Sequence, residues 1–132
     1  MLEPVVADAL DAFRVVSVTG ARQVGKTTLV RRICERRGMS FVSLEDAATR
    51  AAAQSDADAW LAGFPGPVAI DEVQHAPDLF RAIKKRVDAH QRPGQILITG
   101  SALWLSMRTI GESLAGRVAL LELGPFSLAE SL

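Results

Sequence analysis

The stretch VTGARQVGKTTLVRRI, residues 18–33, joins a strand-like apolar run to a helix-like run through a turn rich in glycine and polar residues. Within it, GARQVGKT at residues 20–27 fits the pattern G-x-x-x-x-G-K-[ST]. Gly20 and Gly25 let the backbone wrap around an anion, and the amides of about residues 24–28 point inward. The N-terminus of the following helix adds a favourable dipole. We therefore interpret the turn as a phosphate-binding loop rather than an ordinary glycine turn.

The same loop carries groups that suit a nucleotide and its metal ion. Lys26 is placed to reach the β- and γ-phosphates, and the Thr27 hydroxyl can ligate Mg²⁺. Arg22 and Gln23, inside the loop, could contact phosphate or a partner. We expect these residues to contact the nucleotide: Gly20, Ala21, Arg22, Gln23, Val24, Gly25, Lys26, Thr27 and Thr28.

A second part of the site follows an apolar run in PVAIDEV, residues 67–73. At the end of a buried strand, Asp71 would hold Mg²⁺ directly or through water, and Glu72 would polarise the attacking water. Alone, the two acidic residues would be an ordinary solvated strand end, but the upstream phosphate loop favours the catalytic interpretation. The sequence has no N-K-x-D segment of the kind GTPases use, which favours ATP.

Two further candidates depend more on their context. In ILITGS, residues 96–101, a second polar strand end would lie beside the first, so Ser101 or Thr99 could hydrogen-bond the γ-phosphate or the attacking water. Such residues are also common as strand-end caps. Arg117 precedes a fifth apolar run and could stabilise charge on the transferring phosphoryl group, commonly that of a neighbouring subunit. It could equally be a surface arginine or part of an intramolecular salt bridge.

Periodicity outlines the rest of the domain. Short apolar runs alternate with segments of helical periodicity, which indicates an α/β domain whose parallel sheet is covered by helices on both faces. The expected strands are 15–18, 41–44, 68–70, 96–98 and 118–123. The expected helices are 2–13, 28–37, 47–61 and a segment opened by Pro77 and closed by Pro93.

Length and composition fit one domain of 132 residues with its own core. Lysine plus arginine and aspartate plus glutamate both number 15, so the overall charge does not point to nucleic acid. The single cysteine, Cys34, excludes an internal disulfide and fits a reducing compartment. Because the sequence shows neither a leader nor an apolar run of the roughly 18 residues that span a bilayer, we expect a cytoplasmic location and no membrane partner.

Together these segments resemble the AAA+ superfamily of ATPases, and within it a prokaryotic branch whose members carry a further C-terminal region. The matching pieces span most of the chain from Val16 onward: GARQVGKTTL, FVSLED, IDEVQHAPDLFRAIK, ILITGSA and SLAGRVALLELGPFSLAE. The resemblance implies a three-layer P-loop NTPase fold with five parallel strands in the order 5-1-4-3-2. Residues 1–132 would be an AAA+-like ATP-binding core, without the lid and the C-terminal domain.

The resemblance also assigns roles to individual positions. Residues 20–28 would form the Walker A loop, and residues 71–72 the Walker B pair. Ser101, or Thr99, would be the first sensor, and Arg117 an arginine-finger candidate.

We therefore expect a Mg²⁺-dependent ATP hydrolase that serves as a nucleotide-state switch or motor core and turns over slowly in isolation. Its catalytic residues would be Lys26, Glu72, Ser101 and Arg117, and its metal ligands Thr27 and Asp71. A trans-acting arginine would make it a homo-oligomer, and its target, protein or DNA, is left open. The alternative is a nucleotide-binding sensor or adaptor without hydrolysis, which the presence of Glu72 disfavours. A small-molecule phosphotransferase would need an acceptor site and an arginine-rich lid, which the sequence does not show.

Overall fold

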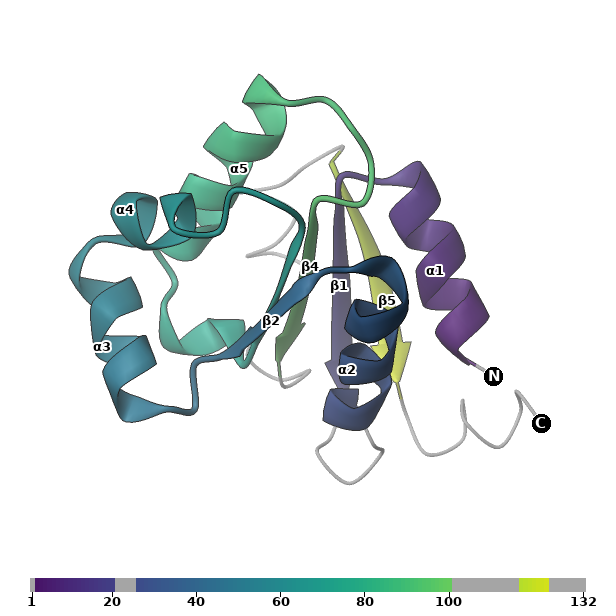
Figure 1. Ribbon diagram of the computed structural model, residues 1–132, viewed down its shortest axis with the longest axis horizontal. Helices are drawn as coiled ribbons and strands as arrows, with labels where there is room; N and C mark the ends of the chain where they lie inside the picture. Colours follow the sequence, from purple (N-terminus) through teal and green to yellow (C-terminus); the bar gives the residue numbers. More distant parts are fainter. Residues whose placement is uncertain (1, 21–25, 101–116, 124–132) are drawn as a thin grey trace.

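The computed structural model describes residues 2–20, 26–100 and 117–123 (Figure 1). The helices are α1 (Leu2–Ala12), α2 (Lys26–Arg37), α3 (Ala47–Ser55), α4 (Ala57–Ala62) and α5 (Leu79–Ala89), with a short 3₁₀ helix, η2, at Val73–His75. The strands are β1 (Val15–Gly20), β2 (Ser40–Ser43), β3 (Val68–Asp71), β4 (Ile96–Gly100) and β5 (Val118–Leu123). All five expected strands are confirmed. None of the helices in these ranges has both the length and the apolar character needed to cross a membrane.

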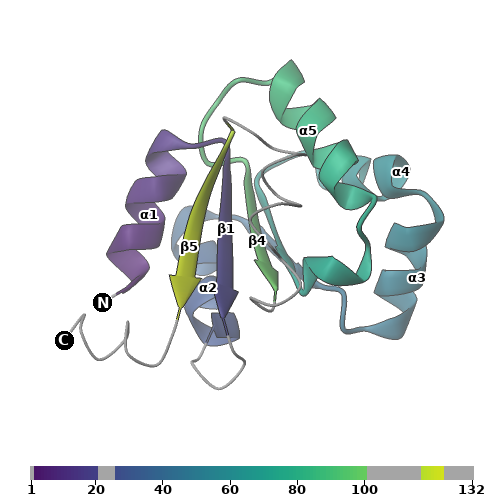
Figure 2. The ribbon, with the colours of Figure 1, turned by 180° about the vertical axis from the view of Figure 1, so that it is seen from behind.

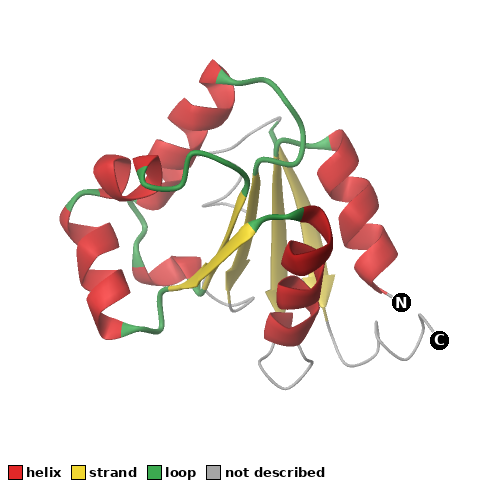
Figure 3. Cartoon of the chain, viewed as in Figure 1, coloured by secondary structure: helices red, strands yellow, loops and turns green. Residues whose placement is uncertain are grey.

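The strands form one parallel sheet in the order β2-β3-β4-β1-β5 (Figure 3). This is the expected order 5-1-4-3-2 counted from the other side. In the register, Val15 of β1 lies opposite both Ile96 of β4 and Val118 of β5. Because parallel strands run the same way, the segments that follow them meet at one edge, which we call the carboxyl edge. The opposite edge, where the strands begin, is the amino edge.

Helices cover both faces of the sheet, α1 and α2 on one side and α3, α4 and α5 on the other (Figures 1 and 2). Successive side chains of a strand point to opposite faces. In β4, Leu97 packs in the core beneath α1 and α2, whereas Ile96 and Ile98 pack in the core beneath the other three helices. All three are fully buried, which explains why the strands read as continuous apolar runs.

The structure corrects one expected element, the single helix over 47–61. The chain forms two helices there because Asp56 has an extended backbone, with φ −155° and ψ 93°. Its side chain accepts a hydrogen bond from the Ala59 amide at 3.1 Å and so caps α4, just as Asp46 caps α3 by accepting from the Thr49 amide at 3.0 Å. The prediction was wrong because it weighed the helix propensity of the alanines above this capping signal.

Candidate functional site

Lys26 reaches the carboxyl edge as the first residue of α2. Its side chain is 2% exposed, and its Nζ donates a hydrogen bond to the backbone oxygen of Gly100, at the end of β4, at 3.0 Å. A buried ammonium is tolerated only with such partners. The contact therefore ties the start of α2 to the end of a strand that lies 74 positions away in the sequence.

Glu72 supplies the opposite charge at the same edge. Its Oε1 lies 3.6 Å from Lys26 Nζ, and the two side chains are almost completely buried. Taking both charges out of water costs so much that an apolar pair of similar volume often serves stability as well or better. A buried ion pair outside the carboxyl ends of parallel strands, where ligands of such sheets bind, therefore marks a candidate functional site.

Asp71, the last residue of β3, is held by hydroxyl groups from the strands on either side. Thr99 Oγ1 of β4 donates to Asp71 Oδ1 at 2.5 Å, and Ser43 Oγ of β2 donates to Oδ2 at 3.1 Å. The Asp71 side chain is buried. Because an ionised carboxylate offers about four lone-pair positions, these two bonds fix its orientation and leave it able to accept a further ligand.

The backbone of Glu72 is left-handed, with φ 57° and ψ 47°, and it is the only residue other than glycine with positive φ in the described part of the chain. This conformation costs a residue with a side chain about 1–2 kcal/mol. The Glu72 amide donates to Thr99 Oγ1 at 3.2 Å, so one hydroxyl anchors both acidic residues. The strained turn keeps the Glu72 carboxylate beside Lys26 while the chain leaves β3 for η2.

Gln74 completes the polar cluster from η2. Its Nε2 donates to Glu72 Oε2 at 3.3 Å. Its Oε1 is buried and has no hydrogen-bond partner among the described residues. Buried acceptors rarely stay unpaired, so this oxygen is suited to accept from a molecule that enters the site.

The other expected nucleotide contacts are only partly described. Gly20 ends β1, and Thr27 and Thr28 are exposed on the first turn of α2. The remaining members of the set lie outside the described residues: Ala21, Arg22, Gln23, Val24, Gly25 and Ser101.

Arg117 lies at the amino edge and is not brought together with Lys26. Its backbone oxygen accepts from the Val15 amide at 3.2 Å, and β1 then extends about 16 Å to Gly20 at about 3.3 Å per residue. Its side chain makes an intramolecular salt bridge, in which Nε lies 2.5 Å from Asp88 Oδ1 and Nη2 lies 3.2 Å from Oδ2. The hydrogen bonds from Arg117 hold the pKa of Asp88 below its ordinary value.

A family model described as an AAA domain matches residues 12–132. The chain belongs to the AAA domain family. The resemblance to AAA-type P-loop ATPases is therefore confirmed, and membership supports a nucleotide-binding, ATPase-like function for this AAA domain.

Curated relatives of the AAA domain are longer proteins. The uncharacterized protein Mb2031c of Mycobacterium bovis and the uncharacterized protein Rv2008c of Mycobacterium tuberculosis are each 40% identical to it over 124 residues. The match covers 92% of this chain and 27% of each relative. The chain thus spans about a quarter of the length of these two proteins.

Two solved structures share the fold of the AAA domain. The Walker-type ATPase PABY2304 of Pyrococcus abyssi superposes with a TM-score of 0.60 at 15% identity, covering 94% of this chain and 52% of that one. A DNA replication initiation factor superposes with a TM-score of 0.59 at 17% identity, covering 97% and 48%. At such low identity these likenesses show the fold alone.

Two site residues of the AAA domain were missed by sequence reasoning. Ser43 ends the strand next to β3, and its role follows only from the sheet order, which places β2 beside β3. Gln74 follows Glu72 by two positions and would have been a candidate from that proximity alone. Lys26 and Glu72, by contrast, were predicted as parts of one nucleotide site from the phosphate-loop pattern and the acidic strand end, and the structure adds that their side chains lie side by side.

The site suits a metal ion that takes few protein ligands. No group of three or more His, Cys, Asp or Glu side chains positioned to hold a metal is found in the described ranges. Mg²⁺ bound with a nucleotide takes one or two protein oxygens and completes its shell with phosphate and water. The Thr27 hydroxyl and the fixed Asp71 carboxylate are oxygen donors of that kind.

Proposed function

We propose that this AAA domain binds ATP with Mg²⁺ at its carboxyl edge and hydrolyses ATP slowly. The observation that carries the proposal is the buried Lys26–Glu72 pair beside Asp71. Folding gains little from such a pair, whereas a phosphate chain needs a cation and its hydrolysis needs a carboxylate near the attacking water. The family and the Walker-type ATPase named among its structural neighbours agree with this function.

Binding would use the start of α2 and the loop before it. Residues 20–28 would surround the phosphates with backbone amides, and Lys26 would donate to the β- and γ-phosphate oxygens. Thr27 and Asp71 would hold Mg²⁺, which when bound neutralises charge on those phosphates. Asp71 is suited to this role because hydroxyl groups orient both of its oxygens.

Hydrolysis would join a water oxygen to the γ-phosphorus and break the bond from that atom to the β–γ bridging oxygen, giving ADP and phosphate. Glu72 would accept a hydrogen bond from the water and take up its proton. The Oε1 of Gln74, which has no partner in the described part of the chain, would accept the second hydrogen and hold the water in line. Of the two sensor candidates, Ser101 would contact the γ-phosphate, because the buried Thr99 hydroxyl already donates its single hydrogen to Asp71.

Lys26 would exchange partners when ATP binds. In the structure its ammonium contacts the Gly100 backbone oxygen and the Glu72 carboxylate. Phosphate oxygens would compete with the Glu72 carboxylate for the Lys26 ammonium, and the displaced carboxylate could then bind the attacking water. ATP binding would therefore also prepare Glu72 to activate the attacking water.

Arg117 would act on the nucleotide of a neighbouring copy, which makes a homo-oligomer part of the proposal. Its distance from its own carboxyl edge and its place at the start of β5 support a role between subunits. Phosphate release per protomer should then rise with protein concentration, and Arg117→Ala should lower turnover more than ATP affinity. Activity per protomer that does not change with concentration would count against this role.

A binding experiment tests the proposed ATP site. Lys26→Ala should weaken ATP binding at least about tenfold, the effect of losing one contact to a charged group. Because that change leaves Glu72 buried without its partner, a second variant, Lys26→Met with Glu72→Gln, removes both charges. Lys84→Ala removes an equal charge from an exposed position on α5 and should bind ATP like the wild type. Wild-type affinity in both Lys26 variants would refute the site.

The setting of this reaction is part of the same proposal. We place the protein in the cytoplasm, which supplies ATP and Mg²⁺ and keeps Cys34 reduced. Residues 1–132 would be the ATP-binding core, and the rest of a longer protein would select the target, protein or DNA.

A further inference from the structure

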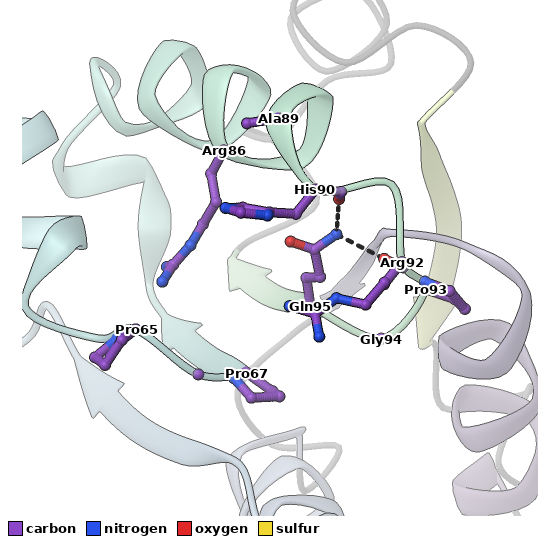
Figure 4. Close-up of a pocket in the computed structure, with 10 residues that line it drawn as sticks. Pro65, Pro67, Arg86, Ala89, His90, Arg92, Pro93, Gly94 and Gln95 are labelled. Carbon is purple, nitrogen blue, oxygen red and sulfur yellow. Dashed lines mark hydrogen bonds between the residues drawn. The ribbon is translucent and has the colours of Figure 1, made fainter.

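A pocket of about 510 Å³ lies at the amino edge, between the loop that enters β3 and the loop that enters β4 (Figure 4). Its volume is within the range of small-molecule sites. Its lining residues come from 65–67 and 86–95, so it shares none with the described part of the proposed ATP site. It is therefore a separate cavity at the other end of the strands.

The pocket is lined by nitrogen-bearing side chains on one side and by prolines on the other. Four such side chains reach toward it from α5 and the following loop: Arg86, His90, Arg92 and Gln95 (Figure 4). Pro65 and Pro67 border it across from them. No aspartate or glutamate belongs to its lining, all of which lies in the described part of the chain. Two arginines without an acidic counterpart give the pocket a positive potential.

Carboxylates on the adjoining helices are engaged elsewhere. Asp88 of α5 pairs with Arg117 and lies 3.7 Å from Arg14. Asp58 of α4 pairs with Lys85 at 3.3 Å. The positive charge of the pocket is therefore not cancelled by these nearby acids.

Hydrogen bonds hold the walls in place before any ligand arrives. Gln95 Nε2 donates to the backbone oxygens of His90 and, at 2.6 Å, of Arg92. Carbonyl oxygens repel an anion, and this amide pairs with that of His90, the residue after α5, and with that of Arg92 in the following loop. Arg86 donates to the backbone oxygen of Phe64 and so fixes the wall that leads to β3. A preformed site loses less affinity to ordering on binding.

We propose that this pocket binds a small molecule through an anionic group, a phosphate or a carboxylate. Arg86 has five N–H groups, of which two go to the backbone oxygens of Leu61 and Phe64, and Arg92 adds an exposed guanidinium. Two guanidinium groups beside one cavity match the paired oxygens of a phosphate or carboxylate. His90 adds an imidazole to the lining.

The two histidines of the chain make a built-in comparison for the test. His90 lines the pocket, whereas His75 ends η2 at the carboxyl edge. Titration of the full chain with inorganic phosphate and, separately, with citrate is followed by the NMR resonances of both imidazoles. The His90 resonance should shift and saturate with half-saturation at or below about 1 mM for at least one anion. The anion with the lower value identifies the group that the pocket takes.

Arg92→Ser should raise the half-saturation concentration at His90 at least about tenfold, since it removes a charge-assisted donor. Arg81→Ser makes the same chemical change at an exposed position of α5 outside the pocket and should leave the titration unchanged. Saturation at His90 that depends on Arg92 supports the proposal. A His90 shift without saturation, or an unchanged titration in Arg92→Ser, would overturn it, whereas a shift at His75 reports anion binding at the carboxyl edge.

Discussion

Replacing Thr99 by valine should destabilise the domain out of proportion to the size of the change. The Thr99 side chain is fully buried, and its hydroxyl donates to Asp71 Oδ1 and accepts from the Glu72 amide. Valine fills similar space without the hydroxyl, so the loss is one hydrogen bond to a charged group and one buried amide left unpaired. Together these amount to about 2–4 kcal/mol of unfolding free energy.

Thr99→Ser is the matched control because it keeps the hydroxyl and removes a methyl group, at a loss of about 1 kcal/mol. Urea unfolding measures both variants. With a slope of about 2 kcal/mol per molar urea, Thr99→Val should lower the midpoint by about 1–2 M and Thr99→Ser by about 0.5 M. A valine variant as stable as the serine variant would refute the conclusion that this hydroxyl holds the two acidic residues in place.

Three further predictions test other contacts. Ser43→Ala removes a hydrogen bond to the proposed magnesium-binding carboxylate of Asp71, so it should raise the Mg²⁺ concentration for half-maximal ATP binding several-fold, about the effect of one such bond. Ser40→Ala, at the exposed start of the same strand, is the control. Equal Mg²⁺ dependence in the two variants would contradict this role of Ser43. Burial raises the pKa of the Cys34 thiol to about 11. Iodoacetamide at pH 8.5 should therefore react with Cys34 at least about fifty times more slowly in the native than in the urea-unfolded chain. Equal reaction rates would contradict the burial of this thiol. Hydrogen bonds from Arg117 lower the pKa of Asp88 in the folded protein. The stability they give is therefore present above the ordinary pKa near 3.8 and is lost as pH falls through the pKa of the folded state. The difference in unfolding free energy between wild type and Asp88→Asn should narrow below about pH 4, and a difference that stays constant down to pH 2 would count against the salt bridge.

Much of the fold could be predicted from the sequence because its central strands are buried on both faces. Runs such as ILI, residues 96–98, are apolar throughout, so their number and order along the chain can be seen directly. Their spatial order was obtained by resemblance, since periodicity alone does not say that β1 lies between β4 and β5. The helix break at Asp56 was missed because the surrounding alanines favour one continuous helix, whereas the Asp56 side chain caps the start of α4.

Short patterns in the sequence point to the candidate site, and the roles of its residues stay predictions. Lys26 and Glu72 come from separate motifs, and the parallel sheet brings them to 3.6 Å. The left-handed backbone of Glu72 and the hydroxyl of Ser43 could not be foreseen, since both depend on contacts between neighbouring strands. Arg117 was left between a role in catalysis and a salt bridge; the structure adds the bond to Asp88, and the role between subunits stays a proposal.

The central claim is ATP hydrolysis at the carboxyl edge, and the most direct test compares ATP binding with phosphate release in Mg²⁺ for the wild type and Glu72→Gln. Glutamine keeps the shape of the side chain but neither carries the charge that competes for Lys26 nor accepts a proton from water. The account predicts that the variant binds ATP at least as tightly as the wild type and releases phosphate at least about a hundredfold more slowly, the usual scale of general-base catalysis. Phosphate release by Glu72→Gln at the wild-type rate would contradict it. So would a wild-type protein that binds ATP but releases no phosphate even at high protein concentration.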